Sequence, residues 1–153
     1  LIESLSILPP YLRNETEDNP SAIDYRDWHV PLGRRFRALK LWFVLRSYGA
    51  ENLRSFIRSH VDWAVDLEKN VNDDPRLELT APRTLALVCF RHVDGNRATK
   101  ELADAINASG SAYVTPSVIN DVSYIRVSIG STWTEQRHVE DLWRLIDANA
   151  GPR

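Results

Sequence analysis

The run TLALVCFR, residues 84–91, constrains the fold more than any other part of the sequence, because it is almost entirely apolar. A strand that is buried on both faces has such a continuous apolar run, whereas a half-buried strand alternates apolar and polar residues. We therefore predict a central strand at residues 84–91. The other elements of the chain are expected to pair with this strand or to cover it.

Two helices are expected before the central strand. Residues 34–48 have a helical pattern, and Gly49 is expected to end that helix, since glycine readily adopts the backbone conformation found after a helix. A second helix is predicted at about residues 51–71, where apolar side chains recur at helical spacing with charges between them. Its expected inward-facing residues are Leu53, Phe56, Ile57, Val61, Ala64 and Val71.

Further strands and helices are expected on both sides of the central strand. A helix is predicted at residues 99–108, and a final helix follows Thr132 and Glu135, which have the spacing of a capping box. Strand patterns separated by turn residues occur at 77–80, 112–115 and 122–129. This order predicts an α+β fold, in which helices lie against one face of a small, mostly antiparallel sheet.

Composition bounds the function. The chain has 153 residues, enough for one compact core, and its net charge of −2 gives no overall attraction to nucleic acid or membrane. No apolar stretch approaches the ~20 residues of a membrane span. We therefore expect no nucleic-acid or membrane partner. The sequence contains no methionine, and we expect it to be a piece of a longer protein.

Cysteine and histidine usage indicates neither a disulfide nor a metal site. The single cysteine, Cys89, lies in the apolar run and is expected to be an inert core thiol in a reducing, cytoplasmic environment. The four histidines, at positions 29, 60, 92 and 138, show no HxxxH spacing, and no CxxC motif occurs. No metal site is expected.

Two groups of residues allow both a binding and a structural interpretation. The basic residues Arg34, Arg35, Arg37 and Lys40 could contact phosphate, but the acidic net charge favours a solvated helix edge. Arg126 lies between Ile125 and Val127 in a predicted strand and so on the opposite face from them. It faces either solvent or a cavity that holds a carboxylate or phosphate, and the alternation alone favours solvent. The tryptophans at 42, 63 and 143 have the spacing of packed core residues.

The most distinctive string in the chain is DYRDWHVPLGRRFRALKLWFVLRSYG, residues 24–49. Proline at position 31 fixes one backbone angle, and Gly33 allows the backbone to approach another group closely. This indicates either a ligand or partner chain near Gly33 or a helix N-terminus in which glycine merely fits. On the segment alone the second interpretation is favoured.

This string, together with LRSFIRSHV, LALVCFR and IRVSIGSTWTEQRHVEDLW, resembles the C-terminal part of the pyridoxal-phosphate-dependent group II decarboxylases. The resemblance is to the aromatic-L-amino-acid decarboxylases, which include the DOPA, tyrosine and tryptophan enzymes. It implies a fold type I enzyme, working as a homodimer on an aromatic L-amino acid. Residues 1–33 would then end the large domain, and residues 34–153 would form the small C-terminal domain.

The resemblance also implies roles for individual residues. Tyr11 matches the tyrosine of the family's mobile catalytic loop, here about residues 8–22, which protonates the substrate carbon after carbon dioxide leaves. Leu32 and Gly33 match positions that reach the partner subunit's cofactor and substrate pocket. Arg126 matches an arginine near the substrate end of the site.

The chain departs from the family pattern in its lysines. The family's cofactor-binding lysine stands in an Asn-Pro-His-Lys context, and none of Lys40, Lys69 and Lys100 has that setting. The lysine that holds pyridoxal 5′-phosphate is therefore expected outside this chain, and the chain alone is expected to be inactive. The alternatives are an aromatic aldehyde synthase of the same family, a non-catalytic remnant that acts as an interaction module, and a truncated reading frame.

Overall fold

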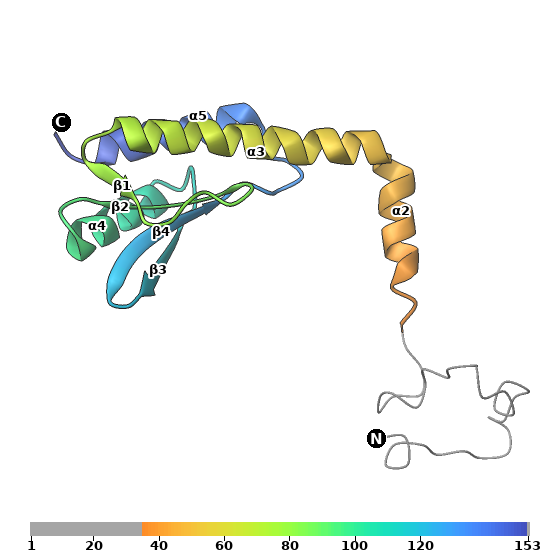
Figure 1. Ribbon diagram of the computed structural model, residues 1–153, viewed down its shortest axis with the longest axis horizontal. Helices are drawn as coiled ribbons and strands as arrows, with labels where there is room; N and C mark the ends of the chain where they lie inside the picture. The colour runs from red at the N-terminus through yellow and green to blue at the C-terminus, as the bar shows by residue number, and fades with distance from the viewer. Residues whose placement is uncertain (1–34, 153) are drawn as a thin grey trace, which may run out of the picture. The chain divides into compact units, whose positions relative to one another are not determined.

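The computed structural model describes residues 35–152 (Figure 1). Its elements, in chain order, are α2 (Ala38–Tyr48), α3 (Ala50–Asp73), β1 (Leu77–Leu79), β2 (Leu87–His92), α4 (Asn96–Ala108), β3 (Thr115–Ile119), β4 (Val122–Ser128) and α5 (Gln136–Asn149). The predicted order of helices and strands is confirmed. Internal contacts divide the chain into two units, Leu1–Ser47 and Tyr48–Arg153, which are described separately. The predicted domain division between residues 33 and 34 lies outside the described residues.

Helix α2 ends at Tyr48, as predicted, but it begins at Ala38 and not at residue 34. Residues 35–37 are not helical. Gly49 follows it with a φ of 75°, a value that favours glycine, so its expected role is confirmed. None of the residues of α2 is buried. The expectation that Trp42 packs in a core is wrong for the described residues, since 54% of it is exposed; its ring lies against the ring of Phe43 and the guanidinium of Arg46.

The second unit contains a four-stranded sheet in the order β1-β2-β4-β3, with every neighbouring pair antiparallel. Strand β2 is central, as its apolar run predicts. In β2, Val88, Phe90 and His92 are buried and alternate with half-buried Leu87, Cys89 and Arg91. Cys89 therefore lies on the opposite face from the core, and the expectation of a core position for it is wrong.

The strand predicted at 112–115 is also wrong, because β3 begins only at Thr115 and continues to Ile119. Its position follows from a tight turn, in which Asn120 and Asp121 both have positive φ, 50° and 62°. Two such residues form a hairpin turn whose twist matches that of the flanking strands. The turn pairs Ile119 with Val122 and so fixes the register of β3 against β4.

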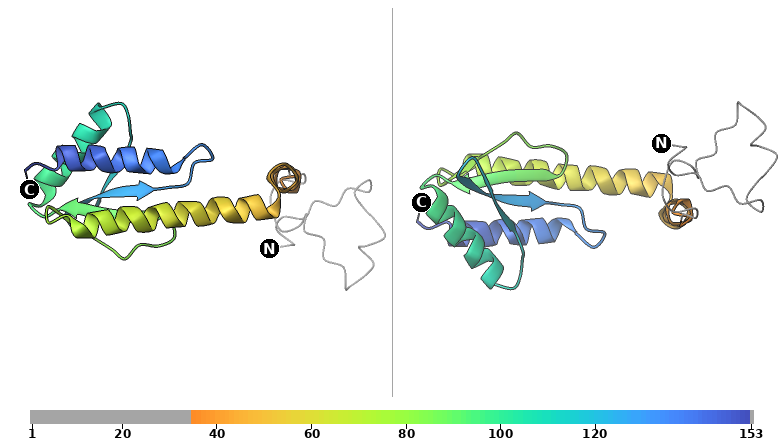
Figure 2. Two further views of the ribbon diagram at one scale, coloured as in Figure 1. Left: turned by 90° about the horizontal axis from the view of Figure 1, so that it is seen from above. Right: turned by 90° about the horizontal axis from the view of Figure 1, so that it is seen from below.

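The core lies between one face of the sheet and the helices. Helices α3 and α5 lie side by side over the sheet, and α4 contacts β2, β4 and α5 (Figure 2). The strands contribute Val88, Phe90, Ile125 and Val127, and the helices contribute Ala64, Leu67, Val71, Leu102, Ala103, Ile106, Val139 and Ile146. Trp63 and Trp143 pack against this cluster, as expected. None of the helices among residues 35–152 is long and apolar enough to span a membrane.

Two details of the helices differ from prediction. In α3, Ala64 and Val71 are buried as expected, but Ile57 is 58% exposed, because no described residue covers that part of the helix. Helix α5 does not use Thr132 as its cap. Glu135 is the N-cap, and His138 completes the capping box by accepting a hydrogen bond from the Glu135 backbone at Nδ1, 3.1 Å away.

Candidate functional site

Of the four predicted site residues, only Arg126 belongs to the described part of the chain. Tyr11, Leu32 and Gly33 lie outside it. Arg126 is an exposed residue of β4, and Ile125 and Val127 on either side of it are buried in the core. Because side chains of a strand alternate between faces, Arg126 lies on the face opposite the core. The exposure expected from the alternation is confirmed.

The sheet places Arg126 next to polar neighbours from two other strands. Its register partners are Cys89 on β2 and Thr115 on β3. Burial raises the pKa of the Cys89 thiol, and the positive charge of Arg126 opposes this increase in part. A raised pKa keeps the thiol protonated, and a protonated thiol is a poor nucleophile. The predicted inertness of Cys89 therefore follows from its half-buried position on this face.

A cavity of about 370 Å³ opens beside Arg126, between the end of β4 and the start of α5. Its lining includes Ser128, Thr134 and His138, and Arg126 is the only arginine or lysine among the described residues that line it. None of the ion pairs between described residues involves Arg126. A guanidinium in this situation can bind a carboxylate or a phosphate through paired N–H donors.

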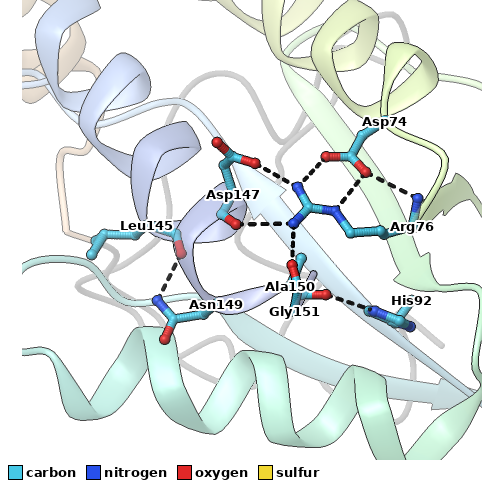
Figure 3. A network of polar contacts seen from close by, with 8 residues as sticks. All are labelled: Asp74, Arg76, His92, Leu145, Asp147, Asn149, Ala150 and Gly151. Atoms are coloured by element: carbon cyan, nitrogen blue, oxygen red, sulfur yellow. Dashed lines mark hydrogen bonds and ion pairs between the residues drawn. The ribbon is translucent and has the colours of Figure 1, made fainter. Parts of the chain in front are cut away.

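Sequence reasoning missed a buried polar network at the other end of the unit (Figure 3). Arg76, 7% exposed, lies just before β1 and binds Asp74 through Nε, at 2.9 Å from Oδ1, and through Nη2. Its Nη1 and Nη2 also donate to Asp147 and to the backbone carbonyl of Gly151, beyond the end of α5. The hydrogen bonds that Arg76 donates to Asp74 are the main reason why the pKa of Arg76 is raised, and the guanidinium stays charged.

His92 extends this network toward the same C-terminal segment. Its Nδ1 accepts a hydrogen bond from the backbone N–H of Asp94 at 3.1 Å, so Nε2 carries the proton and donates to the carbonyl of Ala150, also at 3.1 Å. Arg76 and His92 line a cavity of about 680 Å³. Because the donors of Arg76 are already used within the protein, we assign this network a structural role, holding residues 150–151 against the sheet. No three potential metal ligands cluster anywhere among residues 35–152.

Comparison with known proteins gives these residues a family context. The model of the pyridoxal-dependent decarboxylase conserved domain matches residues 1–93, which is 93 of 153 residues. The chain is 44% identical to tyrosine decarboxylase 2 of Narcissus pseudonarcissus, over 98% of this chain and 31% of that protein.

Two solved structures give the same result. The TDC of Oryza sativa with PLP and tryptamine has a TM-score of 0.84 and 38% identity, over 97% of this chain and 33% of that one. The 4-hydroxyphenylacetaldehyde synthase of Rhodiola rosea has a TM-score of 0.78 and 42% identity, over 97% and 31%. The chain thus spans about a third of the length of these relatives. With a family match over more than half of its length, the chain belongs to the pyridoxal-dependent decarboxylases.

Proposed function

We propose that this chain is part of a pyridoxal-phosphate-dependent carboxy-lyase that converts aromatic L-amino acids into aromatic amines. The observation that carries the proposal is the family match over residues 1–93, which contains Tyr11 and the Pro-Leu-Gly sequence at 31–33. The names of the relatives support the substrate class, since they include a tyrosine decarboxylase and a TDC solved with tryptamine.

The described residues do not by themselves fit the cofactor. A lysine that binds it covalently needs a site that favours its neutral amine, away from bulk water. Lys40, Lys69 and Lys100 are all exposed, and Lys100 Nζ lies 3.2 Å from Asp104 Oδ2, which favours the charged form. This supports the proposal that the covalent lysine lies in a part of the parent protein outside this chain.

The roles proposed for this chain are proton donation and pocket shape. The phenol of Tyr11 is protonated at neutral pH, since its ordinary pKa is about 10, and it donates a proton to the carbon that has lost carbon dioxide. Leu32 and Gly33 line the pocket of the partner subunit in a homodimer, where the missing side chain of Gly33 leaves room for an aromatic ring. Arg126 pairs with a carboxylate near the substrate end of the site.

The surface of α2 supports a larger assembly. Its apolar side chains are exposed, including Leu41, Trp42 and Phe43 at 54–61%. A helix that is apolar on most sides is normally buried in a larger protein. We therefore propose that the rest of the parent protein and its homodimer partner cover α2.

A chimera tests the proposed function. In it, this chain replaces the matching C-terminal third of Narcissus tyrosine decarboxylase 2, and tyrosine is the substrate. The chimera should produce the amine, whereas the 153-residue chain alone should not. Tyr11→Phe should lower amine output at least about tenfold, because it removes the proton donor. Unchanged amine output from Tyr11→Phe would contradict the role of Tyr11, and activity of the chain alone would contradict its status as an incomplete site.

The second candidate is an aromatic aldehyde synthase. The 42% identity to the Rhodiola enzyme is close to the 44% identity to the Narcissus decarboxylase and favours neither activity. We prefer the decarboxylase because Tyr11 matches the decarboxylase tyrosine, in place of the phenylalanine typical of the plant aldehyde synthases. Measuring aldehyde and hydrogen peroxide alongside amine in the same chimera separates the two activities.

A further inference from the structure

The cavity beside Arg126 has no negatively charged group among the described residues that line it, although the chain as a whole has a net charge of −2. Arg126 and His138 are the lining residues that carry or can take up a positive charge. Five further lining residues carry a hydroxyl group: Ser111, Tyr113, Thr115, Ser128 and Thr134. The rest of the lining is apolar. The polar part of the cavity is therefore made of groups that can donate hydrogen bonds.

These donors are not used up within the fold. Neither the guanidinium of Arg126 nor any of the five hydroxyl groups makes a hydrogen bond or ion pair with another described residue. His138 accepts a hydrogen bond from the Glu135 backbone N–H at Nδ1, so the neutral imidazole carries its proton on Nε2. That Nε2–H has no partner among the described residues either. The cavity beside Arg126 thus differs from the Arg76 network, where the donors are already paired.

The start of α5 adds positive potential to the same cavity. Thr134 lies two residues before α5, and His138 lies in its first turn. The N-terminus of a helix carries a partial positive charge and favours anions. The first turn of α5 contains no acidic residue. The N-cap Glu135 does not line the cavity, and its carboxylate pairs with Arg137 Nε at 2.9 Å.

The arrangement of the donors favours a phosphate over a carboxylate. They come from residues 111–115, from β4, from the loop before α5 and from α5 itself. A carboxylate offers two oxygens in one plane and a single charge, whereas a phosphate monoester offers three strong acceptor oxygens in a tetrahedral arrangement and a charge of about −1.5 to −2 at pH 7. The volume of about 370 Å³ lies in the range of small-molecule sites, so it also has room for an organic group.

We propose that the cavity beside Arg126 binds a small phosphate monoester, whose phosphate group accepts hydrogen bonds from Arg126, from His138 Nε2 and from the surrounding hydroxyl groups. This binding goes beyond the proposed function, in which Arg126 pairs with a carboxylate. One consequence rests on that function: a bound phosphate uses the same guanidinium and therefore competes with the carboxylate. Free phosphate and a phosphate monoester share the same recognition chemistry, and the test separates them.

Isothermal titration calorimetry of the 153-residue chain, in a phosphate-free buffer at fixed ionic strength, measures the binding. The probes are glycerol 3-phosphate, inorganic phosphate and acetate. We expect one saturable site that binds glycerol 3-phosphate most tightly, because its organic group gains further contacts. Acetate should bind at least about tenfold more weakly than glycerol 3-phosphate, since it has less charge and fewer acceptor oxygens.

Three variants connect the binding to this cavity. Arg126→Met keeps most of the side-chain stem of an exposed residue and should weaken glycerol 3-phosphate binding at least about tenfold. Thr134→Val keeps the shape of the side chain, removes one hydroxyl and should weaken binding about threefold. Arg97→Met is the matched control, because Arg97 is also exposed but pairs with Glu101 and does not line the cavity. It should leave the affinity unchanged. Circular dichroism checks that each variant is folded, and Thr134→Val decides if Arg126→Met is not.

The chimera with Narcissus tyrosine decarboxylase 2 tests the competition. Glycerol 3-phosphate should raise the KM for tyrosine and leave kcat unchanged. Phosphate binding to the chain together with an unchanged KM would contradict the carboxylate role of Arg126, and a chimera that makes no amine would contradict the proposed function. In both cases the phosphate site itself stands on the calorimetry.

The calorimetry has three results that would overturn the site. They are the absence of saturable binding, equal affinities of the wild-type chain and its Arg126→Met and Thr134→Val variants, and acetate binding as tight as that of glycerol 3-phosphate. Inorganic phosphate that binds as tightly as glycerol 3-phosphate would assign the cavity to the free ion and overturn the choice of a monoester.

Discussion

Removing the Arg76 guanidinium should destabilise the second unit more than any other single charge removal among the described residues. Three side-chain nitrogens of Arg76 make five hydrogen bonds, to both oxygens of the Asp74 carboxylate, to the Asp147 carboxylate and to the carbonyls of Asp147 and Gly151. Arg76→Met keeps much of the volume and removes all five. The carboxylate of Asp74, whose side chain is 3% exposed, then stays buried without its cation.

The size of the effect follows from burial. Breaking a buried ion pair by removing one partner costs about 3–5 kcal/mol, because the remaining buried charge loses its counter-ion. Arg144 provides the control, since it also pairs with two carboxylates, of Glu140 and Asp141, but its side chain is 70% exposed. Arg144→Met should cost about 1 kcal/mol or less.

Urea unfolding of the 153-residue chain, followed by far-UV circular dichroism, measures both variants. An unchanged slope with urea would show that the midpoint shift reports stability. Adding Asp74→Leu to Arg76→Met should recover part of the loss, because the buried negative charge of Asp74 is then removed as well. The reasoning is refuted if Arg76→Met costs no more than Arg144→Met.

Three further outcomes are expected. Burial lowers the pKa of His60 below its ordinary value of 6.5, so below pH 6.5 the unfolded chain takes up a proton that the folded chain does not. The free energy of unfolding should therefore decrease as the pH falls from 6.5 to the lowered pKa. In His60→Phe, the urea midpoint should change less with pH over this range. Because burial raises the pKa of Cys89, its thiol should react with iodoacetamide more slowly than glutathione at pH 8, and Arg126→Ala should slow it further by removing a nearby positive charge. Asp121→Val places a β-branched residue at a φ of 62° and should cost about 1–2 kcal/mol in urea unfolding, whereas Ser128→Val on an extended strand should not.

Element order could be predicted from the sequence because it depends on local patterns. The apolar run in β2 identifies a central strand without knowledge of its neighbours. The error at β3 concerns the bounds of the strand. Pro116 directly follows the predicted strand at 112–115, and β3 runs through it because β3 is an edge strand, where proline is tolerated. The Asn120–Asp121 turn was the signal that could have corrected this prediction.

The candidate site was less accessible to sequence reasoning. The exposure of Arg126 followed from strand alternation, but its cavity depends on His138 of α5 and on Thr134 in the loop before it. The Arg76 network joins residues 74, 76, 147 and 151, and no local pattern relates such distant positions. Likewise, nothing in the spacing of α3 shows that Ile57 is exposed, since apolar side chains recur at helical spacing along the whole helix. The roles of Tyr11, Leu32 and Gly33 remain predictions from family resemblance.

The anchoring of residues 150–151 by Arg76 and His92 bears on the order of events during synthesis. Arg76 leaves the ribosome about 75 residues before Gly151, the most distant of its partners. Until α5 has emerged, the growing chain holds a guanidinium and a carboxylate at a site that is still open to water. The sheet strands can pair earlier, but the layer above them closes only when the last helix arrives. A stop codon before position 147 would thus release a chain in which the charges of Arg76 and Asp74 stay exposed to water. Such a chain would be a target for quality-control proteases.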